Sequence, residues 1–336
     1  MIIQPTVSIC CITYNHENFI GQAIESFLMQ KTSFPIEILI HDDASTDKTA
    51  DIIREYELKY PDIIKPIYQT ENQYSKGVSI SATYQYPRAL GKYIALCEGD
   101  DYWTDSLKLQ KQVDFLEGNE EYGLIHTNNY VLYNGSGKII LNKTKTKYDV
   151  KDGYVFEKIL TGDLSITTCT VLAKSSILLN LPDLDLINNP NNLQGDLPRW
   201  LSLSNQSKVK YLGEPTAVYR HNRGSASMST SILGKIKFQE SSKRLRKEFA
   251  ERYNVNIKVY ERVCAMYHRV ILEKAFLNKD IELYEETIKK IIDIKLKDYI
   301  KYYYIKNNFF YLLMKLPLYI VNVIRNMKTN LLNENI

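Results

Sequence analysis

Cysteine is scarce in this sequence, and the few cysteines are scattered rather than grouped in motifs. An odd number in mostly apolar, strand-like surroundings argues against a disulfide framework and predicts reduced, buried thiols, which favours the cytoplasm. No charged and apolar leader precedes the first expected strand, near Thr6, so we expect no secretory signal. The five cysteines are Cys10, Cys11, Cys97, Cys169 and Cys264.

Glycine-rich phosphate loops and membrane-spanning segments are missing too. There is no G-x-G-x-x-G and no Walker A lysine, so backbone amides are not the expected cradle for a diphosphate. The tail over 309–324 is apolar, but Lys315, Pro317 and Asn322 interrupt it, and it falls short of the about 20 apolar residues of a spanning helix. Peripheral contact of basic, aromatic helices with a membrane and plain packing on the domain both remain open.

A large excess of charge of one sign is also absent. The 43 Lys and Arg nearly balance the 39 Asp and Glu, which gives a formal net charge of +4 and no indication of a nucleic-acid partner. The acidic motifs lie early, whereas the chain after Lys235 is rich in Lys and Arg. With 336 residues, 44% of them hydrophobic, the chain can form one large domain or two smaller ones.

Apolar runs and helical stripes alternate through the first part of the chain. Apolar runs predict buried strands over 7–12, 36–40 and 93–97, and a short strand is expected between the last two, over 64–68. Apolar residues spaced by three and four predict helices over 19–28, 50–56 and 108–116, and Ser45 or Thr46 is expected to cap the second. This alternation is typical of a mostly parallel α/β sheet.

The later chain is expected to contain further strands and then helices. Strand patterns occur over 123–141, with a hairpin at Asn134-Gly135, and over 166–173, 209–212 and 216–219. Pro198 suits the first turn of a helix whose N-cap would be Asp196. We predict an α/β part over 1–115, a second part of the same domain over 116–231 and a helical region, a candidate for membrane contact, over 232–336.

Acidic residues follow two of the predicted strands. Asp42 and Asp43 end the second, and Glu98, Asp100 and Asp101 end the fourth. Because ligands of parallel sheets bind at the carboxyl ends of the strands, both groups should lie at one edge. Closely packed carboxylates repel one another unless a cation joins them, and oxygen ligands suit Mg²⁺ or Mn²⁺. A solvated acidic turn is the alternative.

With these residues in view, the chain resembles the family 2 glycosyltransferases of the GT-A fold. Three stretches match that family's opening motifs in order and spacing, namely 7–15, 37–47 and 93–101. The match is firm over about the first 115 residues. The resemblance implies that 1–115 binds the nucleotide sugar and that 116–231, in the same GT-A domain, binds the acceptor. Gly195-Asp196 with Trp200, and then Tyr219-Arg220-His221, resemble the family's later motifs more loosely.

The resemblance implies transfer of a sugar, of the hexosyl type, from a nucleotide-diphosphate sugar to an acceptor hydroxyl with inversion. Asp43 then resembles the acid that accepts a hydrogen bond from uracil, and Thr13, Tyr14 and Asn15 would line the nucleotide pocket. Asp42 would hold the ribose or shape the turn. A UDP-sugar is the donor that the resemblance favours.

The resemblance also implies a metal site and a base. Asp100 and Asp101 resemble the Asp-x-Asp pair that binds the ion, Asp100 also lying against the nucleotide, while Glu98 stands at the first motif position. Which two of the three carboxylates touch the ion stays open. Asp196 resembles the general base, with a plain helix cap as the alternative. His221 is a candidate metal or diphosphate ligand, although a lone histidine after a strand is also commonly structural.

Two basic and two aromatic side chains complete the candidates. Lys76 and Arg88 are candidate diphosphate contacts, although most such side chains are only solvated. Trp103 and Trp200 could form an aromatic floor for the sugar or simply pack in the core.

Three other hypotheses are weighed against this one. A sugar-nucleotide pyrophosphorylase normally has a glycine-rich basic loop after its first strand, whereas residues 13–18 contain no glycine. A receiver-like phosphate-accepting module would be much shorter than this chain. A catalytically silent relative that only binds nucleotide sugar stays open. The favoured hypothesis is a cytoplasmic enzyme, or one at the inner face of the membrane, that assembles surface polysaccharide on a glycan or lipid-linked acceptor.

Overall fold

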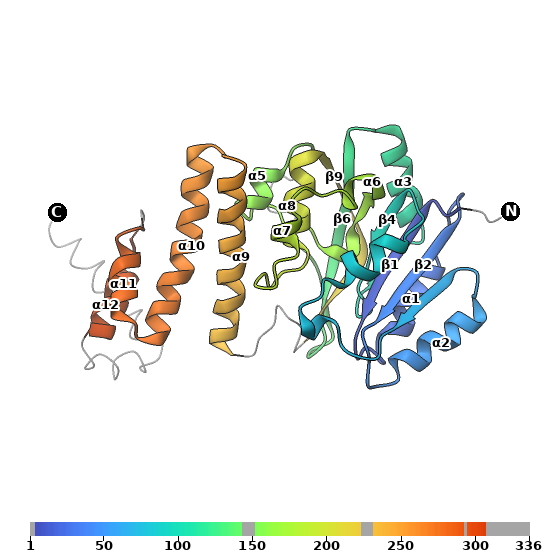
Figure 1. The fold of residues 1–336 in the computed structure, drawn as a ribbon, viewed down its shortest axis with the longest axis horizontal. Coiled ribbons are helices and arrows are strands. Elements are labelled where there is room, and N and C mark those ends of the chain that lie inside the picture. The colour runs from blue at the N-terminus through green and yellow to red at the C-terminus, as the bar shows by residue number, and fades with distance from the viewer. Residues whose placement is uncertain (1–3, 143–151, 223–230, 292–293, 307–336) are drawn as a thin grey trace. The chain divides into compact units, whose positions relative to one another are not determined.

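The computed structural model describes residues 4–142, 152–222, 231–291 and 294–306, and Figure 1 shows their arrangement. The chain divides into two compact units, Met1–Val263 and Cys264–Ile336. The described strands of the first unit form one sheet in the order β3-β2-β1-β4-β8-β6-β9-β5, with β7 paired to β6. They are β1 Val7–Thr13, β2 Ile36–Asp42, β3 Ile64–Tyr68, β4 Tyr93–Leu96, β5 Tyr102–Trp103, β6 Tyr122–Tyr133, β7 Lys138–Leu141, β8 Leu172–Lys174 and β9 Lys208–His221.

The described α-helices lie in both units. In the first unit they are α1 Ile20–Leu28, α2 Thr49–Lys59, α3 Lys108–Gly118, α5 Phe156–Leu160, α6 Ser175–Leu178, α7 Leu184–Ile187, α8 Leu197–Gln206 and α9 Ile232–Arg252. α10 Ile257–Asn278 spans the unit boundary, and α11 Ile281–Ile288 and α12 Leu296–Lys306 lie in the second unit. The predicted α/β class with a helical C-terminal region is therefore confirmed.

The first four strands in the sheet order form its parallel half. β1 pairs in parallel with β2 and β4, and β2 pairs in parallel with β3, as the alternating pattern predicted. Apolar side chains on both faces of these strands are removed from water, for example Ile9, Ile38 and Ile94. Burial on both faces explains why β1 and β4 read as nearly continuous apolar runs, whereas the edge strand β3 is only partly buried.

Beyond β4 the sheet is mixed, and two predictions about it are wrong. The expected strand over 166–173 is reduced to β8, because Thr168–Thr170 forms a 3₁₀ turn. The expected pair of strands over 209–212 and 216–219 is a single strand, β9, which runs parallel to β6. The register between β6 and β9 shifts next to Asn128, so the Gly213–Pro215 interruption is absorbed as a bulge rather than as a turn.

The predicted cap of the second helix is wrong as well. α2 begins only at Thr49, and the Asp47 carboxylate accepts the Thr49 backbone N–H at 2.9 Å. Ser45 is engaged elsewhere, because its hydroxyl donates to Asp42 and accepts the backbone N–H of Asn15 at 2.9 Å. A tertiary contact between two loops therefore takes the side chain that local pattern assigned to the helix.

The second unit has a small core of its own, formed by Leu272, Ala275, Tyr284 and Ile291. No helix in the described part of the chain combines the length and the apolar character needed to cross a bilayer. The apolar segment over 309–324, which raised the question of membrane contact, lies outside the described residues.

Candidate active site

The acidic residues after β4 are held by β9 and the residue that follows it. Asp101 is 1% exposed and accepts the Arg220 backbone N–H at 2.7 Å. Asp100 accepts a hydrogen bond from the side-chain amide of Asn222, also at 2.7 Å. The Arg220 guanidinium donates to the Asp100 carbonyl and so fixes the turn between the two acids. Strand pairing thus turns a flexible acidic loop into an ordered set of carboxylates.

The Arg220 side chain is itself clamped. Its guanidinium carbon lies 4.9 Å from the Phe19 ring centroid and 4.7 Å from that of Tyr102. A second guanidinium nitrogen donates to Gln22 on α1. Stacked and hydrogen-bonded in this way, Arg220 ties α1, β9 and the acidic turn together.

The carboxylates of this turn repel one another. Burial, followed by the charge of Asp100, raises the pKa of Glu98 to about 8, and Asp196 contributes in the same direction. Burial and the charges of Asp100 and Glu98 also raise the pKa of Asp101 well above its ordinary value. A bound cation would relieve this repulsion and lower both pKa values.

Asp196 joins this group from another element. It is the N-cap of α8, where one carboxylate oxygen accepts the Leu197 backbone N–H at 2.8 Å, as the sequence predicted. Its other oxygen accepts a hydrogen bond from the Thr168 hydroxyl at 3.3 Å. Thr168 also lowers the pKa of Glu98 through a hydrogen bond. The Thr168 hydroxyl therefore lies between Asp196 and the acidic turn.

Arg199 secures the turn that carries Asp196. From the first turn of α8 its guanidinium donates to the Gly195 carbonyl and, at 2.6 Å, to the Ser79 hydroxyl. Sequence reasoning missed Thr168, Arg199 and Asn222. Their partners are 28, 120 and 122 residues away in the chain, and no local pattern marks such contacts.

The remaining ligand candidate of the metal group, His221, packs in a tilted arrangement against another ring. Its ring centroid lies 5.0 Å from that of Tyr133, the residue opposite it in the β6–β9 register. The neighbouring positions, Arg220 and Asn222, are the ones whose side chains contact Asp100.

The predicted nucleotide residues at the end of β1 line a different part of the edge. Thr13 is buried, and its hydroxyl lies 3.1 Å from Nδ1 of His16. Tyr14 is 42% exposed, and Asn15 adopts a positive φ of 54° while its side-chain oxygen accepts the Thr46 backbone N–H at 2.8 Å. Burial lowers the pKa of His16, whereas the charge of Asp100 raises it, so His16 lies between these residues and the acidic turn.

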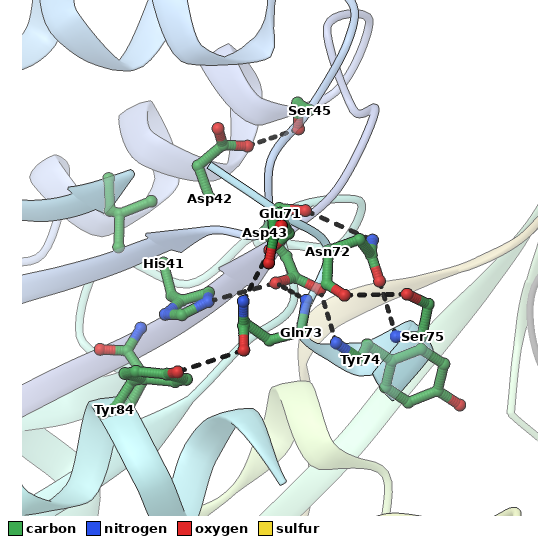
Figure 2. A network of polar contacts seen from close by, with 12 residues as sticks. His41, Asp42, Asp43, Ser45, Glu71, Asn72, Gln73, Tyr74, Ser75 and Tyr84 are labelled. Carbon is green, nitrogen blue, oxygen red and sulfur yellow. Dashed lines mark hydrogen bonds and ion pairs between the residues drawn. The ribbon is translucent and has the colours of Figure 1, made fainter. Parts of the chain in front are cut away.

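Asp43 faces a loop of its own chain, as Figure 2 shows. Its two carboxylate oxygens accept the backbone N–H groups of Gln73 and Tyr74 at 2.8 and 3.0 Å. Nε2 of His41 lies 3.6 Å from the same carboxylate, and Tyr84 lies against the His41 ring. Asp43 therefore holds the loop after β3 in place, and a carboxylate accepts further donors without losing these two.

Asp42 and the two basic candidates have partners as well. Burial raises the pKa of Asp42, against a hydrogen bond from Ser45. Lys76, next to the left-handed Gly77, pairs with Glu71. Arg88 is half-buried and donates to the Gln85 side chain at 3.0 Å.

Both tryptophans are buried. Trp103 packs edge-on against Phe27 and donates its indole N–H to the Cys169 carbonyl at 2.8 Å. Trp200 lies in the core around α8. Their burial favours packing over an exposed aromatic floor.

The oxygen-rich donor set fits a hard divalent cation. Within the described ranges, no three Asp, Glu, His or Cys side chains already form a ligand cluster. Mg²⁺ and Mn²⁺ sites of transferases commonly use one or two carboxylates together with phosphate oxygens of the substrate. Glu98 and Asp100 lie close enough for their charges to repel, and these two carboxylates are enough for a site of that kind.

Gly99 allows the close approach between the acidic turn and β1. A Cβ atom at this position would lie 2.6 Å from the Thr13 hydroxyl oxygen and 2.7 Å from Thr13 Cβ. We expect Gly99→Ala to lower the free energy of unfolding by about 1–3 kcal/mol, measured by urea titration, because a buried strand must shift. Gly118→Ala is the control, since nothing lies within 4 Å of its Cβ position. Equal stability of the two variants would contradict the close approach.

Comparisons with known proteins agree on one family. The model of glycosyl transferase family 2 matches residues 8–171. Over 117 residues the chain is 46% identical to uncharacterized protein Rv1520 of Mycobacterium tuberculosis, covering 34% of this chain and 32% of that protein. The chain thus covers about a third of the length of such mycobacterial relatives. It is 27% identical over 266 residues to the Escherichia coli UDP-Glc:alpha-D-GlcNAc-diphosphoundecaprenol beta-1,3-glucosyltransferase WfaP, covering 79% of this chain and 92% of that one.

Solved structures share the fold at low identity. Residues 1–349 of TarS from S. aureus, in complex with UDP-GlcNAc, superpose with a TM-score of 0.55 at 14% identity, covering 90% of this chain and 91% of that one. PcManGT, a mannosyltransferase from Pyrobaculum calidifontis in complex with GDP-Man and Mn²⁺, gives 0.54 at 14% identity, covering 85% and 74%. These likenesses confirm the predicted GT-A type of fold.

Proposed function

Because this chain belongs to glycosyl transferase family 2, we propose that it is a metal-dependent, inverting hexosyltransferase. It would move a sugar from a nucleotide-diphosphate sugar to an acceptor hydroxyl. The observation that carries the proposal is the Thr168 hydroxyl between Asp196 and the acidic turn, because it sets a base candidate beside a cation-binding candidate. A reaction that deprotonates an alcohol and releases a diphosphate needs both groups.

Asp196 is the proposed general base. Its carboxylate would accept the proton of the acceptor hydroxyl while that oxygen bonds to the anomeric carbon and the bond to the diphosphate breaks. Attack from the face opposite the leaving group inverts the anomeric carbon. The N-cap bond from Leu197 and the Thr168 contact hold the carboxylate in place before the acceptor arrives.

The proposed divalent-cation site is formed by Glu98 and Asp100, with Asp101 fixed behind them by Arg220. A bound Mg²⁺ or Mn²⁺ would neutralise the charge that develops on the departing diphosphate. Glu98 and Asp101 have raised pKa values, so cation binding should release protons from this group. Whether His221 contributes stays a prediction.

The proposed donor is a UDP-sugar, and the proposed pathway is assembly of a surface polysaccharide. WfaP is named for a UDP-Glc donor and a lipid-diphosphate acceptor, and TarS is described with UDP-GlcNAc, which supports this choice. PcManGT is described with GDP-Man, so the base of the nucleotide must be tested rather than assumed. Contact of the C-terminal helices with the inner face of the membrane stays a prediction.

Metal-dependent binding of the donor nucleotide tests the proposal. We expect UDP with Mn²⁺ to raise the melting temperature by about 3–5 °C when its concentration is far above the dissociation constant. The rise should vanish with EDTA, and GDP and dTDP should give smaller rises. If no nucleoside diphosphate shifts the melting temperature with Mn²⁺ or Mg²⁺, the proposed function is wrong.

A further inference from the structure

Helix α9 supports the segment that leads to the proposed base. The Phe238 carbonyl accepts a hydrogen bond from the Gln194 side chain at 2.9 Å. The Ser241 hydroxyl accepts the Leu193 backbone N–H at 3.0 Å and donates to the Asn191 carbonyl at 3.1 Å. Leu245 is fully buried on the same helix. In Figure 1, α9 runs beside α5 and α8. The helix thus forms one wall behind the turn that carries Asp196.

Arg246 brings a positive charge from this wall toward Asp196. Its guanidinium donates to the carbonyls of Ile159 and, at 3.0 Å, Leu160 at the end of α5. The Nε–H is buried and has no partner among the described residues. Burial lowers the pKa of Arg246 to about 10, and the charge of Asp196 acts in the opposite direction. Arg246 and the proposed base therefore lie within electrostatic reach of each other.

Lys243 lies one helical turn before Arg246, on the same face of α9. It is half-buried, and burial together with the charge of Arg246 lowers its pKa to about 8. No carboxylate oxygen of the described chain lies within ion-pair distance of either cation. Other basic residues of this helix do have such partners, for example Lys247 with Glu251 at 2.5 Å.

Two cations in this position are costly unless an anion joins them. Like charges a turn apart repel, and partial burial removes water that would otherwise screen them. The proposed function already assigns the donor diphosphate to the acidic turn and its cation. A second anion would therefore come from the acceptor.

We propose that Lys243 and Arg246 form a subsite for a phosphoryl group of the acceptor, next to the hydroxyl that Asp196 deprotonates. The planar guanidinium and the compact ammonium suit phosphate oxygens, which accept several donors at once. The inference rests on the proposed function, because it requires Asp196 to face an acceptor. It adds that this acceptor carries a phosphate or diphosphate near its reacting sugar.

Calorimetric titration of the full chain with inorganic pyrophosphate in EDTA tests the subsite. EDTA removes the cation that the donor side would need. We expect Lys243→Gln to weaken pyrophosphate binding about tenfold, the loss typical of a charge-assisted contact. Lys247→Gln is the matched control and should bind as the wild type does, because Lys247 is paired with Glu251. The Lys243 side chain makes no hydrogen bond to the residues that the structure describes, so its variant should unfold at an unchanged or higher urea concentration.

Further ligands separate the sources of the anion. Geranyl diphosphate represents a lipid carrier, and glycerol 3-phosphate represents a phosphate-bearing glycan. The ligand whose affinity falls more in Lys243→Gln than in the wild type identifies the source of the phosphoryl group. Equal pyrophosphate affinity in Lys243→Gln and the wild type would refute the subsite. So would displacement of bound pyrophosphate by UDP without metal, because the pyrophosphate would then lie in the donor site. Tighter binding of D-glucuronate than of pyrophosphate would also refute it, because the site would then prefer a carboxylate to a phosphate.

Failure of the subsite and failure of the proposed function give different results. Sugar transfer with an unchanged acceptor KM in Lys243→Gln would refute the subsite alone. Lysine-dependent pyrophosphate binding without any metal-dependent nucleotide binding would refute the proposed function and leave an anion site in place.

Discussion

Replacing Asp196 by Asn should lower the rate of sugar transfer by about 10²–10⁴-fold, the range expected when a general base is removed. An amide cannot accept the acceptor proton, although it has nearly the same shape as the carboxylate. The donor site should be unaffected, so the melting-temperature shift with UDP and Mn²⁺ should be retained. The measurements are initial rates of nucleoside diphosphate release and the thermal shift of the same preparation.

The fold should tolerate this change because Asn caps helices as well as Asp does. In Asp196→Asn, the side-chain oxygen can still accept the Leu197 N–H. Asp280, the N-cap of α11, supplies the matched control, since its carboxylate accepts the Leu283 N–H at 2.9 Å in the second unit. Asp280→Asn should transfer sugar at the wild-type rate. Nearly full activity in Asp196→Asn would show that Asp196 only caps the helix and is not the general base.

Much of this site could be predicted because its chain segments carry local signals. The apolar runs fixed the strands of the parallel half, and acids placed directly after them had to reach its carboxyl edge. Asp196 was found through the helix start that it shares with Pro198. These features depend on residues a few positions apart.

The parts that could not be predicted depend on contacts across the sheet. Asp43 illustrates this, because its loop partners Gln73 and Tyr74 lie 30 and 31 residues further along the chain. Ser45 was likewise predicted to cap a helix, but its hydroxyl donates to Asp42 and accepts the backbone N–H of Asn15. In both cases a polar side chain that could bond to nearby backbone also contacts a residue about 30 positions away, and sequence patterns cannot rank these options.

The burial of Lys108 is a further feature that the helical pattern did not predict. As the first residue of α3 it is fully buried, and its Nζ donates to the Gln112 side chain at 2.8 Å. The ammonium also lies 4.3 Å from the Trp103 ring centroid. No carboxylate in the described part of the chain lies within ion-pair distance. Burial therefore lowers the pKa of Lys108 to about 8.

The lowered pKa makes stability depend on pH with a definite sign. Between pH 8 and the ordinary lysine pKa of about 10.4, the unfolded chain binds a proton that the native chain does not. The contribution of Lys108 to the free energy of unfolding should therefore rise with pH across this window. Below pH 8 the native chain has to hold a buried ammonium, which costs roughly 3 kcal/mol at 1.36 kcal/mol per pKa unit.

Lys108→Met should therefore stabilise the protein at pH 7. Methionine fills a similar volume and removes the buried charge. Gln112 then loses its hydrogen-bond donor and Trp103 loses its cation contact, so we expect the free energy of unfolding to rise by only about 1–2 kcal/mol. Urea titrations at pH 7, 8 and 9.5 should show this gain shrinking as the pH rises, because the wild type then folds with a neutral amine.

Lys111→Met on the same helix is the control. Lys111 pairs with Asp105 and Glu214 at the surface, and removing this lysine should lower the free energy of unfolding by less than about 1 kcal/mol. A stability difference between wild type and Lys108→Met that stays constant from pH 7 to pH 9.5 would mean that Lys108 keeps an ordinary pKa in the core.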